Sequence, residues 1–526
     1  MDFILRLLQF IVKIVYNIVY VILSVVLPRK KNEQIPAIKD KLVTIPLVEI
    51  VQLMRTKRLT SQQLVKAYIE RIKEVNPHIN AIVQERFEEA LADAKRADDL
   101  IFKCANSQLT QLYARYPLLG IPFTVKESCG LKGMSYVVGS LQRVDKKAER
   151  DCIAVENLKS AGAIPLLVSA NPEYCFSIET NSYTNGKCLN PYDFRRSCGG
   201  SSGGEGALNG SGATLFGIGS DIAGSIRIPS LFNGVFGHKP TGGLIPNTGV
   251  FPSSDDEECN QYLQTGVISR FGSDLGLLLH IMAGANAEKM EFVHPIETKD
   301  IKIYYSLGFS GLNGILHHSV TAEIQIAILK AVKCLQQSGL TVEIAQIKAM
   351  ENSSEIAFSA IARLKKLPLL MREDASVKEL LQELVKSYCK ASKYTKEGLT
   401  FELLRRTNAF MSAEKLIKYK AEGEKLKEEI ISLLGNDGVL FFPTFPVPAI
   451  HHHTSSLAQW AIDYSLLFNI LGLPCTHIPM GVDSDGLPVG FQVIAAPFKD
   501  KLCLQIAGAL EMAFGGWTPP VKHEFS

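Results

Sequence analysis

The first part of the chain is apolar, except for polar residues that return every three or four positions. Residues 7–27 include fifteen Leu, Ile, Val and Phe residues, and a helix of this length, at about 1.5 Å per residue, is long enough to cross a bilayer. In such a helix, the spacing places the polar residues on one narrow stripe. The stripe consists of Arg6, Gln9, Lys13, Asn17, Tyr20 and Ser24.

The polar stripe leaves the mode of membrane attachment open. Each aliphatic residue favours insertion by about 0.3 to 0.6 kcal/mol, whereas Lys13 near the middle costs about 2.5 to 3.5 kcal/mol. A single membrane span therefore competes with a helix that lies in the membrane interface. A buried amphipathic core helix is the third alternative, which the basic sequence Arg29-Lys30-Lys31 disfavours because it isolates the segment.

We expect an uncleaved anchor helix at residues 1–31 and one further domain at residues 32–526. The apolar segment has no small-residue cleavage site, which argues against a signal peptide that is removed. Basic residues after the segment outnumber those before it, and this bias predicts a cytoplasmic domain.

Beyond residue 41, helical and strand-like patterns alternate. Thr60 and Gln63 form a capping-box signature before an amphipathic helix that we expect to end at Asn76-Pro77, and residues 87–103 predict a second helix. Seven short apolar runs between turn residues predict strands. They begin at Gly120, Ile164, Thr214, Ile301, Val439, His477 and Val489. The alternation predicts an α/β protein with a large, twisted mixed sheet covered by helices.

A long helical region follows at about residues 317–434, with a break near Pro368. It contains apolar residues that either pack in the core or face a lipid tail, and the sequence favours the core. These residues are Leu399, Phe401, Leu403, Leu404 and Phe410.

The composition is that of a folded protein without an electrostatic surface for nucleic acid. Of 526 residues, 46% are apolar and 21% are charged, with a net charge of +3, which excludes an intrinsically disordered chain. Runs of Lys and Arg do not exceed three residues, so we expect no nucleic-acid partner.

The cysteines and histidines do not indicate a metal site. The 11 cysteines are scattered without a C-x-x-C pair, so we expect neither a disulfide framework nor a zinc site. No H-E-x-x-H sequence occurs, and the run His451-His452-His453 predicts a solvated loop.

Two glycine-rich segments carry the most informative serines of the chain. Residues 199–207 read GGSSGGEGA, and residues 217–229 read GIGSDIAGSIRIP. Glycine at this density lets the backbone approach another group closely. The phosphate-loop and dinucleotide-loop patterns are absent, so we expect no cofactor. Serines in such loops are commonly turn formers, and a catalytic role requires a base nearby.

Lys126 offers such a base. It follows the apolar run at residues 120–125, which predicts a strand. A lysine at an ordinary strand end extends to water and keeps its charge, whereas burial disfavours the ammonium form. An uncharged lysine can accept a proton from a serine hydroxyl, as in the Ser-Lys variants of the catalytic triad.

Lys126 after an apolar strand, together with the two glycine-rich segments, resembles the amidase signature family. The separation of 24 residues between Ser201 and Ser225 agrees with the pattern of that family. The resemblance continues at residues 237–241, 468–474 and 486–492, and it covers roughly residues 42–515. It implies the amidase signature fold.

The resemblance implies a relay in which Ser225 is the nucleophile, Ser201 the bridging proton carrier and Lys126 the terminal base. It places an oxyanion hole at four successive backbone N–H groups. These belong to Ile222, Ala223, Gly224 and Ser225, and the family usually has glycine where this chain has Ala223.

Further positions match the family around this relay. Ser202, Asp221 and Arg227 are implied to support the loop, although a purely structural ion pair explains Asp221 and Arg227 better. Cys175 matches a position that lines the acyl site, and a packed thiol explains it equally well. The resemblance also implies a cis peptide bond between Gly200 and Ser201.

With the apolar amino terminus, the resemblance implies a membrane-attached serine amidohydrolase that cleaves fatty-acid amides, such as primary fatty amides and N-acylethanolamines. The expected partners are this substrate and membrane lipid, and the sequence leaves open whether the protein forms a homo-oligomer. The expected location is an intracellular membrane such as the endoplasmic reticulum or a lipid droplet. The alternatives are a broad-specificity amidase, a protein of the aminoacyl-tRNA amidotransferase type, and an inactive membrane-tethered lipid-binding scaffold.

Overall fold

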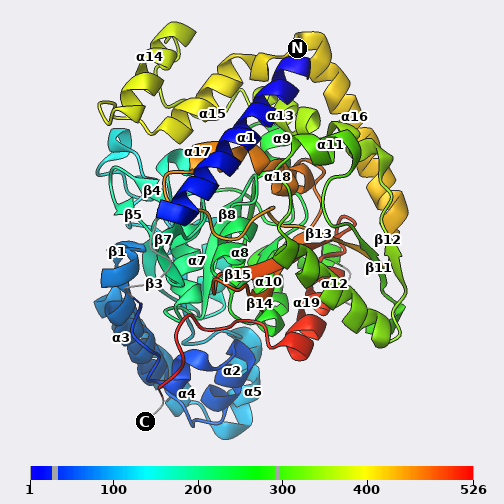
Figure 1. Ribbon diagram of the computed structural model, residues 1–526. Helices are drawn as coiled ribbons and strands as arrows, with labels where there is room; N and C mark the ends of the chain where they lie inside the picture. Colours follow the sequence, from blue (N-terminus) through cyan, green and yellow to red (C-terminus); the bar gives the residue numbers. More distant parts are fainter. Residues whose placement is uncertain (1, 27–33, 291–296, 525–526) are drawn as a thin grey trace.

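One mixed β-sheet crosses the whole molecule (Figure 1). The computed structural model describes residues 2–26, 34–290 and 297–524. Within these residues, the sheet has eleven strands, of which β2 pairs in parallel with β3 and β8, and β11 with β12 and β13, while the other pairs are antiparallel. From edge to edge the strands are β1 (Ile82–Glu85), β3 (Ile164–Ser169), β2 (Pro122–Lys126), β8 (Phe216–Asp221), β10 (Gln264–Ser269), β9 (Phe236–Lys239), β14 (Cys475–Val482), β15 (Pro488–Ala495), β13 (Gly438–Phe442), β11 (Lys302–Tyr305) and β12 (Val342–Ile344).

All seven apolar runs that predicted strands lie in this sheet, as β2, β3, β8, β11, β13, β14 and β15. The prediction of an α/β protein with a large mixed sheet is therefore confirmed. The sequence did not predict β1, β9, β10 and β12, because these strands are short or begin with polar residues. Two small ribbons lie apart from the sheet: β4 (Asn181–Ser182) with β5 (Gly186–Lys187), and β6 (Leu189–Asn190) with β7 (Asp193–Ser197).

Helices cover the sheet and extend above it (Figure 1). The predicted helical region at about residues 317–434 contains all of α12–α16, but also the edge strand β12. The helices are α1 (Asp2–Val26), α2 (Leu47–Arg55), α3 (Ser61–Ile79), α4 (Phe87–Lys103), α5 (Leu109–Arg115), α6 (Ile153–Ser160), α7 (Gly203–Gly210), α8 (Arg227–Phe232), α9 (Glu257–Tyr262), α10 (Leu275–Ala283), α11 (Gly311–Leu316), α12 (Ala322–Gln337), α13 (Ser353–Arg363), α14 (Val377–Tyr388), α15 (Lys396–Arg406), α16 (Ala413–Leu434), α17 (Ser455–Ala458), α18 (Asp463–Ile470) and α19 (Asp500–Phe514).

The predicted start of α3 is confirmed, but its predicted end is wrong. Thr60 and Gln63 form the complete capping box, and α4 has the predicted bounds. However, α3 continues through Pro77 to Ile79 and ends at Asn80, which adopts the left-handed conformation. Asn is one of the few residues that tolerate this conformation, so it terminates the helix where the proline does not.

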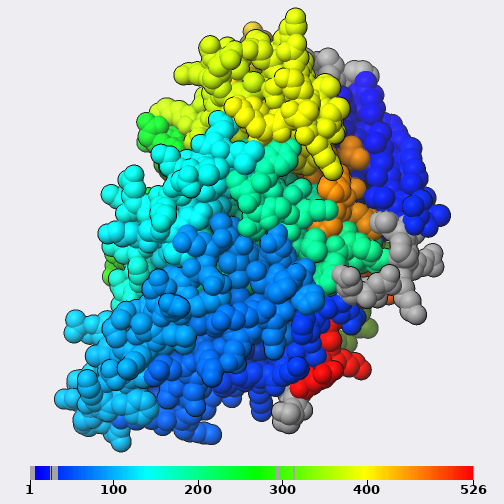
Figure 2. Space-filling model, turned by 90° about the vertical axis from the view of Figure 1, so that its left-hand side faces the viewer, coloured from blue at the N-terminus to red at the C-terminus, as the bar shows by residue number. Residues whose placement is uncertain are grey.

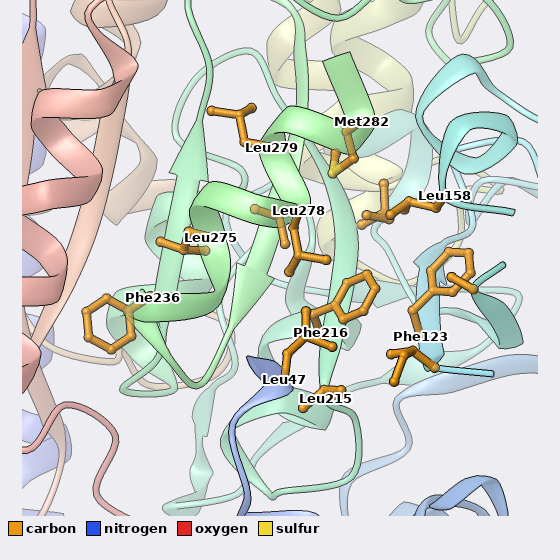
Figure 3. Close-up of a cluster of buried hydrophobic side chains, with 14 of the residues drawn as sticks. Leu47, Phe123, Leu158, Leu215, Phe216, Phe236, Leu275, Leu278, Leu279 and Met282 are labelled. Carbon is orange, nitrogen blue, oxygen red and sulfur yellow. The ribbon is translucent and has the colours of Figure 1, made fainter. Parts of the chain in front are cut away.

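The main hydrophobic core lies where α10 packs over β2 and β8 (Figure 3). Leu275, Leu278 and Met282 of α10 are buried with Phe123 of β2 and Phe216 of β8, whose rings stack with centroids 5.6 Å apart. Side chains alternate across a strand, so Phe123 and its neighbour two residues on point into this core. Lys126 consequently points to the opposite face of the sheet, where α7 lies.

Helix α1 contains the one stretch of the described residues that is long and apolar enough to cross a membrane, Arg6–Leu23. It runs along the outside of the molecule, and Figure 2 shows it as a ridge at the edge. Val21, Val25 and most other apolar side chains of α1 are exposed. The predicted boundary at residue 31 and the basic residues Arg29, Lys30 and Lys31 lie outside the described residues.

The polar stripe of α1 turns partly toward the rest of the protein. Arg6, Gln9 and Lys13 form hydrogen bonds to residues 315–355, whereas Asn17 and Tyr20 are exposed. The side chain of Ser24 lies outside the described residues. Tyr16, which is not part of the predicted stripe, is buried. The helix is therefore attached to the protein along one side instead of projecting from it.

Candidate active site

The two glycine-rich segments meet because β2 and β8 are parallel neighbours. Thr124 lies opposite Gly217 in their register, so the strands end at the same edge of the sheet. Glycine in β8 lets α7 approach closely, because a Cβ atom on Gly219 would lie 2.8 Å from Ser202 Oγ. Lys126 at the end of β2 and Ser201 before α7 are thus brought together.

Lys126 and the Ser201 hydroxyl are in hydrogen-bond contact inside the protein. Lys126 is fully buried, and its Nζ donates to Ser201 Oγ at 2.7 Å and to Ser220 Oγ at 3.0 Å. The peptide bond between Gly200 and Ser201 is cis, as the resemblance implied. Sequence reasoning missed Ser220, which lies inside the second glycine-rich segment, because nothing in that pattern distinguishes it.

Ser225 lies beside this pair and lines a cavity. Its backbone carbonyl accepts a hydrogen bond of 3.1 Å from Ser202 N, and the Ser202 hydroxyl donates to Ser220 O at 3.3 Å. The two hydroxyls of Ser201 and Ser225, both in the described part of the chain, are not hydrogen-bonded to each other in this structure. The structure therefore brings the three residues of the expected relay together, but the hydrogen bond between the Ser201 and Ser225 hydroxyls is not formed.

Asp221 and Arg227 form a fully buried ion pair behind the loop that carries Ser225. Two hydrogen bonds of 3.0 Å join Arg227 Nε and Nη2 to the carboxylate, and Arg227 Nη1 donates to Gln492 Oε1 at 2.7 Å. Burial by itself would raise the pKa of Asp221, but the Arg227 charge and the hydrogen bonds hold that pKa well below its ordinary value. The ion pair connects the two ends of the loop, and the supporting role that the resemblance implied stays a prediction.

The structure corrects the expected set of oxyanion-hole donors at Gly224. Gly224 N donates to Asp221 Oδ1 at 2.7 Å, because the carboxylate caps the turn, and this N–H is therefore occupied. Among the described residues, the N–H groups of Ile222, Ala223 and Ser225 have no hydrogen-bond partner. These three remain the candidates for an oxyanion hole.

The cavity beside Ser225 has a volume of about 60 Å³, which is smaller than the about 300 to 1,000 Å³ of most ligand pockets. Its lining side chains are mainly apolar, and among these described residues none is charged. They are Cys175, Phe176, Ser177, Ile178, Ile222, Ala223, Ser225, Phe358, Ile361, Thr400, Phe401, Leu404, Gln459, Trp460 and Ile462.

For several cavity residues, the sequence left open whether they pack in the core or face an acyl chain. Cys175 is half-buried and lines the cavity beside Ser225, and its implied place in an acyl site stays a prediction. Phe401 and Leu404 also line it, and the Phe401 ring stacks on Phe176 with centroids 4.1 Å apart. Both residues also pack in hydrophobic clusters, Leu404 as a buried member, so the favoured core interpretation is confirmed and the acyl-tail alternative stays a prediction. Leu399 is buried away from the cavity.

The run of histidines is only in part the solvated loop that the sequence predicted, because His453 is exposed but His451 and His452 are not. His451 is buried, and His452 Nδ1 lies 2.7 Å from the buried carboxylate of Glu179. This contact depends on a residue that is 273 positions away in the sequence. Across the described ranges, no group of three His, Cys, Asp or Glu side chains is arranged to hold a metal ion.

Glu205 of α7 provides a test of the electrostatics next to the relay. It is fully buried, its Oε2 accepts a hydrogen bond of 2.5 Å from Thr124 Oγ1, and burial raises its pKa to about 7. A raised pKa means that ionisation destabilises the fold as pH rises from the unfolded-state pKa of about 4.3 to about 7. The unfolding free energy of Glu205→Gln minus that of wild type should therefore increase by about 3 kcal/mol from about pH 5 to about pH 8. Denaturant unfolding of both proteins at the two pH values measures this difference.

The surface variant Glu70→Gln on α3 controls for the loss of one carboxylate. A stability difference between wild type and Glu205→Gln that stays the same at both pH values would contradict the prediction.

Comparison with known proteins agrees with this geometry. The family model for amidases matches residues 63–504. The chain is 38% identical to fatty-acid amide hydrolase 2-B of Danio rerio over 500 residues, which cover 93% of each protein. It is 35% identical to fatty-acid amide hydrolase 2 of Homo sapiens over 528 residues, which cover 99% of this chain and 98% of that protein.

A solved structure shares the fold. The crystal structure of an amidase superimposes with a TM-score of 0.71 at 24% identity, covering 90% of this chain and 100% of that one. The resemblance seen in the two glycine-rich segments is thereby confirmed over nearly the whole length. The chain belongs to the amidase signature family and is a hydrolase that acts on amide C–N bonds.

Proposed function

We propose that this protein is a membrane-attached serine hydrolase that cleaves fatty-acid amides to a fatty acid and an amine. The observation that carries the proposal is the buried hydrogen bond of 2.7 Å between Lys126 and Ser201, next to an apolar cavity lined by Ser225. A base, a hydroxyl and an apolar cavity thus lie together.

In the proposed mechanism, Lys126 accepts the Ser201 proton while Ser201 accepts the Ser225 proton. Ser225 Oγ bonds to the amide carbon, and the relay then returns its proton to the nitrogen as the C–N bond breaks. Water hydrolyses the acyl-enzyme and releases the fatty acid. In this mechanism the Ser225 hydroxyl rotates toward Ser201 and forms the hydrogen bond that is absent from the structure. Catalytic hydrogen bonds often tighten only when substrate binds.

The proposed oxyanion hole consists of the N–H groups of Ile222, Ala223 and Ser225. These groups stabilise the negative charge that appears on the carbonyl oxygen in the tetrahedral intermediate, and each donor of such a site typically contributes about 3 to 4 kcal/mol. The ion pair between Asp221 and Arg227 holds the loop in place.

The lining of the cavity supports an acyl chain over an amino acid as substrate. A glutamine or glutamyl group carries charges that would need charged partners, and the described lining residues offer none. An alkyl chain needs only apolar walls, which Phe358, Phe401 and Leu404 supply. The relative named fatty-acid amide hydrolase 2-B supports the same substrate class.

The exposed apolar side of α1 supports attachment to a membrane. Because Arg6, Gln9 and Lys13 bind the protein, the opposite side is free to enter the lipid interface, so we favour an interfacial helix over a span. We propose an intracellular membrane, such as the endoplasmic reticulum or a lipid droplet, with the catalytic domain in the cytoplasm.

The substrate class is tested by filling the cavity. Leu404→Trp adds volume to the cavity wall, so kcat/KM should fall about tenfold or more for long-chain fatty amides and much less for short ones. Turnover of a series of amides of increasing chain length measures this. Ile417→Trp, at an exposed position of α16 outside the cavity, is the control. Equal losses at every chain length would argue against an acyl-chain cavity.

A further inference from the structure

A buried polar side chain of α1 reaches a cluster inside the catalytic domain. Gln9 is only 4% exposed, and its Nε2 donates to Ser354 Oγ at 2.8 Å. Ser354 Oγ lies 2.7 Å from Asp463 Oδ2 and 2.6 Å from His317 Nε2, and all three residues are buried. Burial of a polar group is costly unless it is hydrogen-bonded, so this contact specifies one docked position of the helix. We call these four residues the Gln9 latch.

Other contacts hold α1 on both sides of the Gln9 latch. Arg6 forms an ion pair with Glu355 and donates from Nη2 to Asn352 Oδ1 at 2.9 Å. On the other side, Lys13 Nζ donates to Ile315 O at 2.8 Å, and the Tyr16 ring packs edge-on against His318. A helix that served only as a membrane tether would require none of these contacts.

The Gln9 latch is connected to the nucleophile loop through α18. Asp463 is the first residue of α18, and Arg227 binds two later residues of that helix, Ser465 O at 3.1 Å and Asn469 Oδ1 at 2.5 Å. Asn469 Nδ2 in turn donates to Asp221 O at 2.9 Å and to Asp221 Oδ1 at 3.0 Å.

The same helix also borders the loop and the cavity directly. A Cβ atom on Gly224 would lie 2.6 Å from Ser465 Cβ, so α18 and the loop are in close contact. Trp460 and Ile462, which immediately precede α18, line the cavity. One end of α18 is therefore bound by the Gln9 latch, while its body supports the loop that carries Ser225.

We propose that α1 is a positioning element of the active site. The Gln9 latch fixes the start of α18, and α18 holds the Ser225 loop and one cavity wall in their working geometry. Membrane anchoring and turnover are then coupled through one helix. This inference rests on the proposed function, and Gln9 is a positioning residue that does not touch the substrate.

The test compares two substitutions on α1 in the full-length protein. Gln9→Leu removes the donor and keeps the helix apolar, and Asn17→Leu makes a similar change at an exposed position. With a short, water-soluble amide, Gln9→Leu should lower kcat between about 10- and 100-fold with a smaller change in KM. It should slow fluorophosphonate labelling of Ser225 to a similar degree and leave membrane retention intact. Asn17→Leu should match wild type in every measurement.

A second variant separates positioning from a loss of folding. Ser354→Ala removes the hydroxyl that accepts the hydrogen bond from Gln9. If the four residues of the Gln9 latch act as a unit, the variant that combines Gln9→Leu with Ser354→Ala should lose no more activity than the less active single variant. Wild-type kcat and labelling in Gln9→Leu, or additive losses in the double variant, would overturn the inference. An inactive and unlabelled wild type would instead refute the proposed function.

Discussion

Replacing Ser225 with alanine should reduce amide hydrolysis by about 10⁴-fold or more, because the alanine variant cannot form the acyl-enzyme. Covalent labelling by a fluorophosphonate probe should disappear in the same variant. The change removes one oxygen atom at the edge of the cavity, so the fold should be retained. The measurements are kcat/KM for a soluble amide and the labelling stoichiometry of intact protein.

Ser230→Ala is the matched control for Ser225→Ala. Ser230 is a buried serine five residues further along, and its hydroxyl donates only to Ile226 O at 2.8 Å. This variant should keep both activity and labelling. Labelling that persists in Ser225→Ala would leave the proposed nucleophile without support, and a wild type that is neither labelled nor active would favour the inactive lipid-binding scaffold.

Replacing Lys126 with methionine should slow amide turnover by about 10³-fold or more and ester turnover much less. The amide nitrogen leaves poorly unless it is protonated, and the relay through Ser201 supplies that proton, whereas the alcohol of an ester leaves more readily. Methionine fills a similar volume, which limits the loss of stability at this fully buried position. The measurement is the ratio of kcat/KM for an amide and an ester that share one acyl group.

Lys239→Met controls for the loss of a buried lysine. Lys239 is also fully buried, but its Nζ donates to Pro240 O at 2.8 Å and does not contact the relay. Its removal should leave the ratio of amide to ester turnover unchanged. An equal loss on both substrates in Lys126→Met would contradict a role in protonating the leaving group.

Much of the fold could be predicted because its signals are local. Short apolar runs between turn residues identified seven strands, and the pair Thr60 and Gln63 identified the start of α3. The end of α3 was misplaced, because proline weakens a helix by removing one hydrogen bond, whereas packing of the helix can compensate for that loss. The family could be inferred from the sequence because its glycines, serines and lysine occur at characteristic spacing.

The site could be predicted only in part. Lys126, Ser201 and Ser225 lie together as expected, and their catalytic roles stay predictions that the variants above test. Ser220 and the occupied N–H of Gly224 were missed, because both depend on how two strands and a turn face each other. Phe358 and Trp460 of the cavity wall were also missed, since they come from separate parts of the chain.

By itself, the sequence determined the α/β architecture and the family and proposed the catalytic residues, since apolar runs, turn residues and short motifs are local signals. Only the tertiary structure decided which side of α1 meets the protein, which N–H groups remain available and what encloses the cavity. Gln9 and Ser354 are 345 positions apart, and their contact exists only because packing of the whole chain brings them within hydrogen-bond distance. Contacts of that kind leave no periodic pattern in a single sequence.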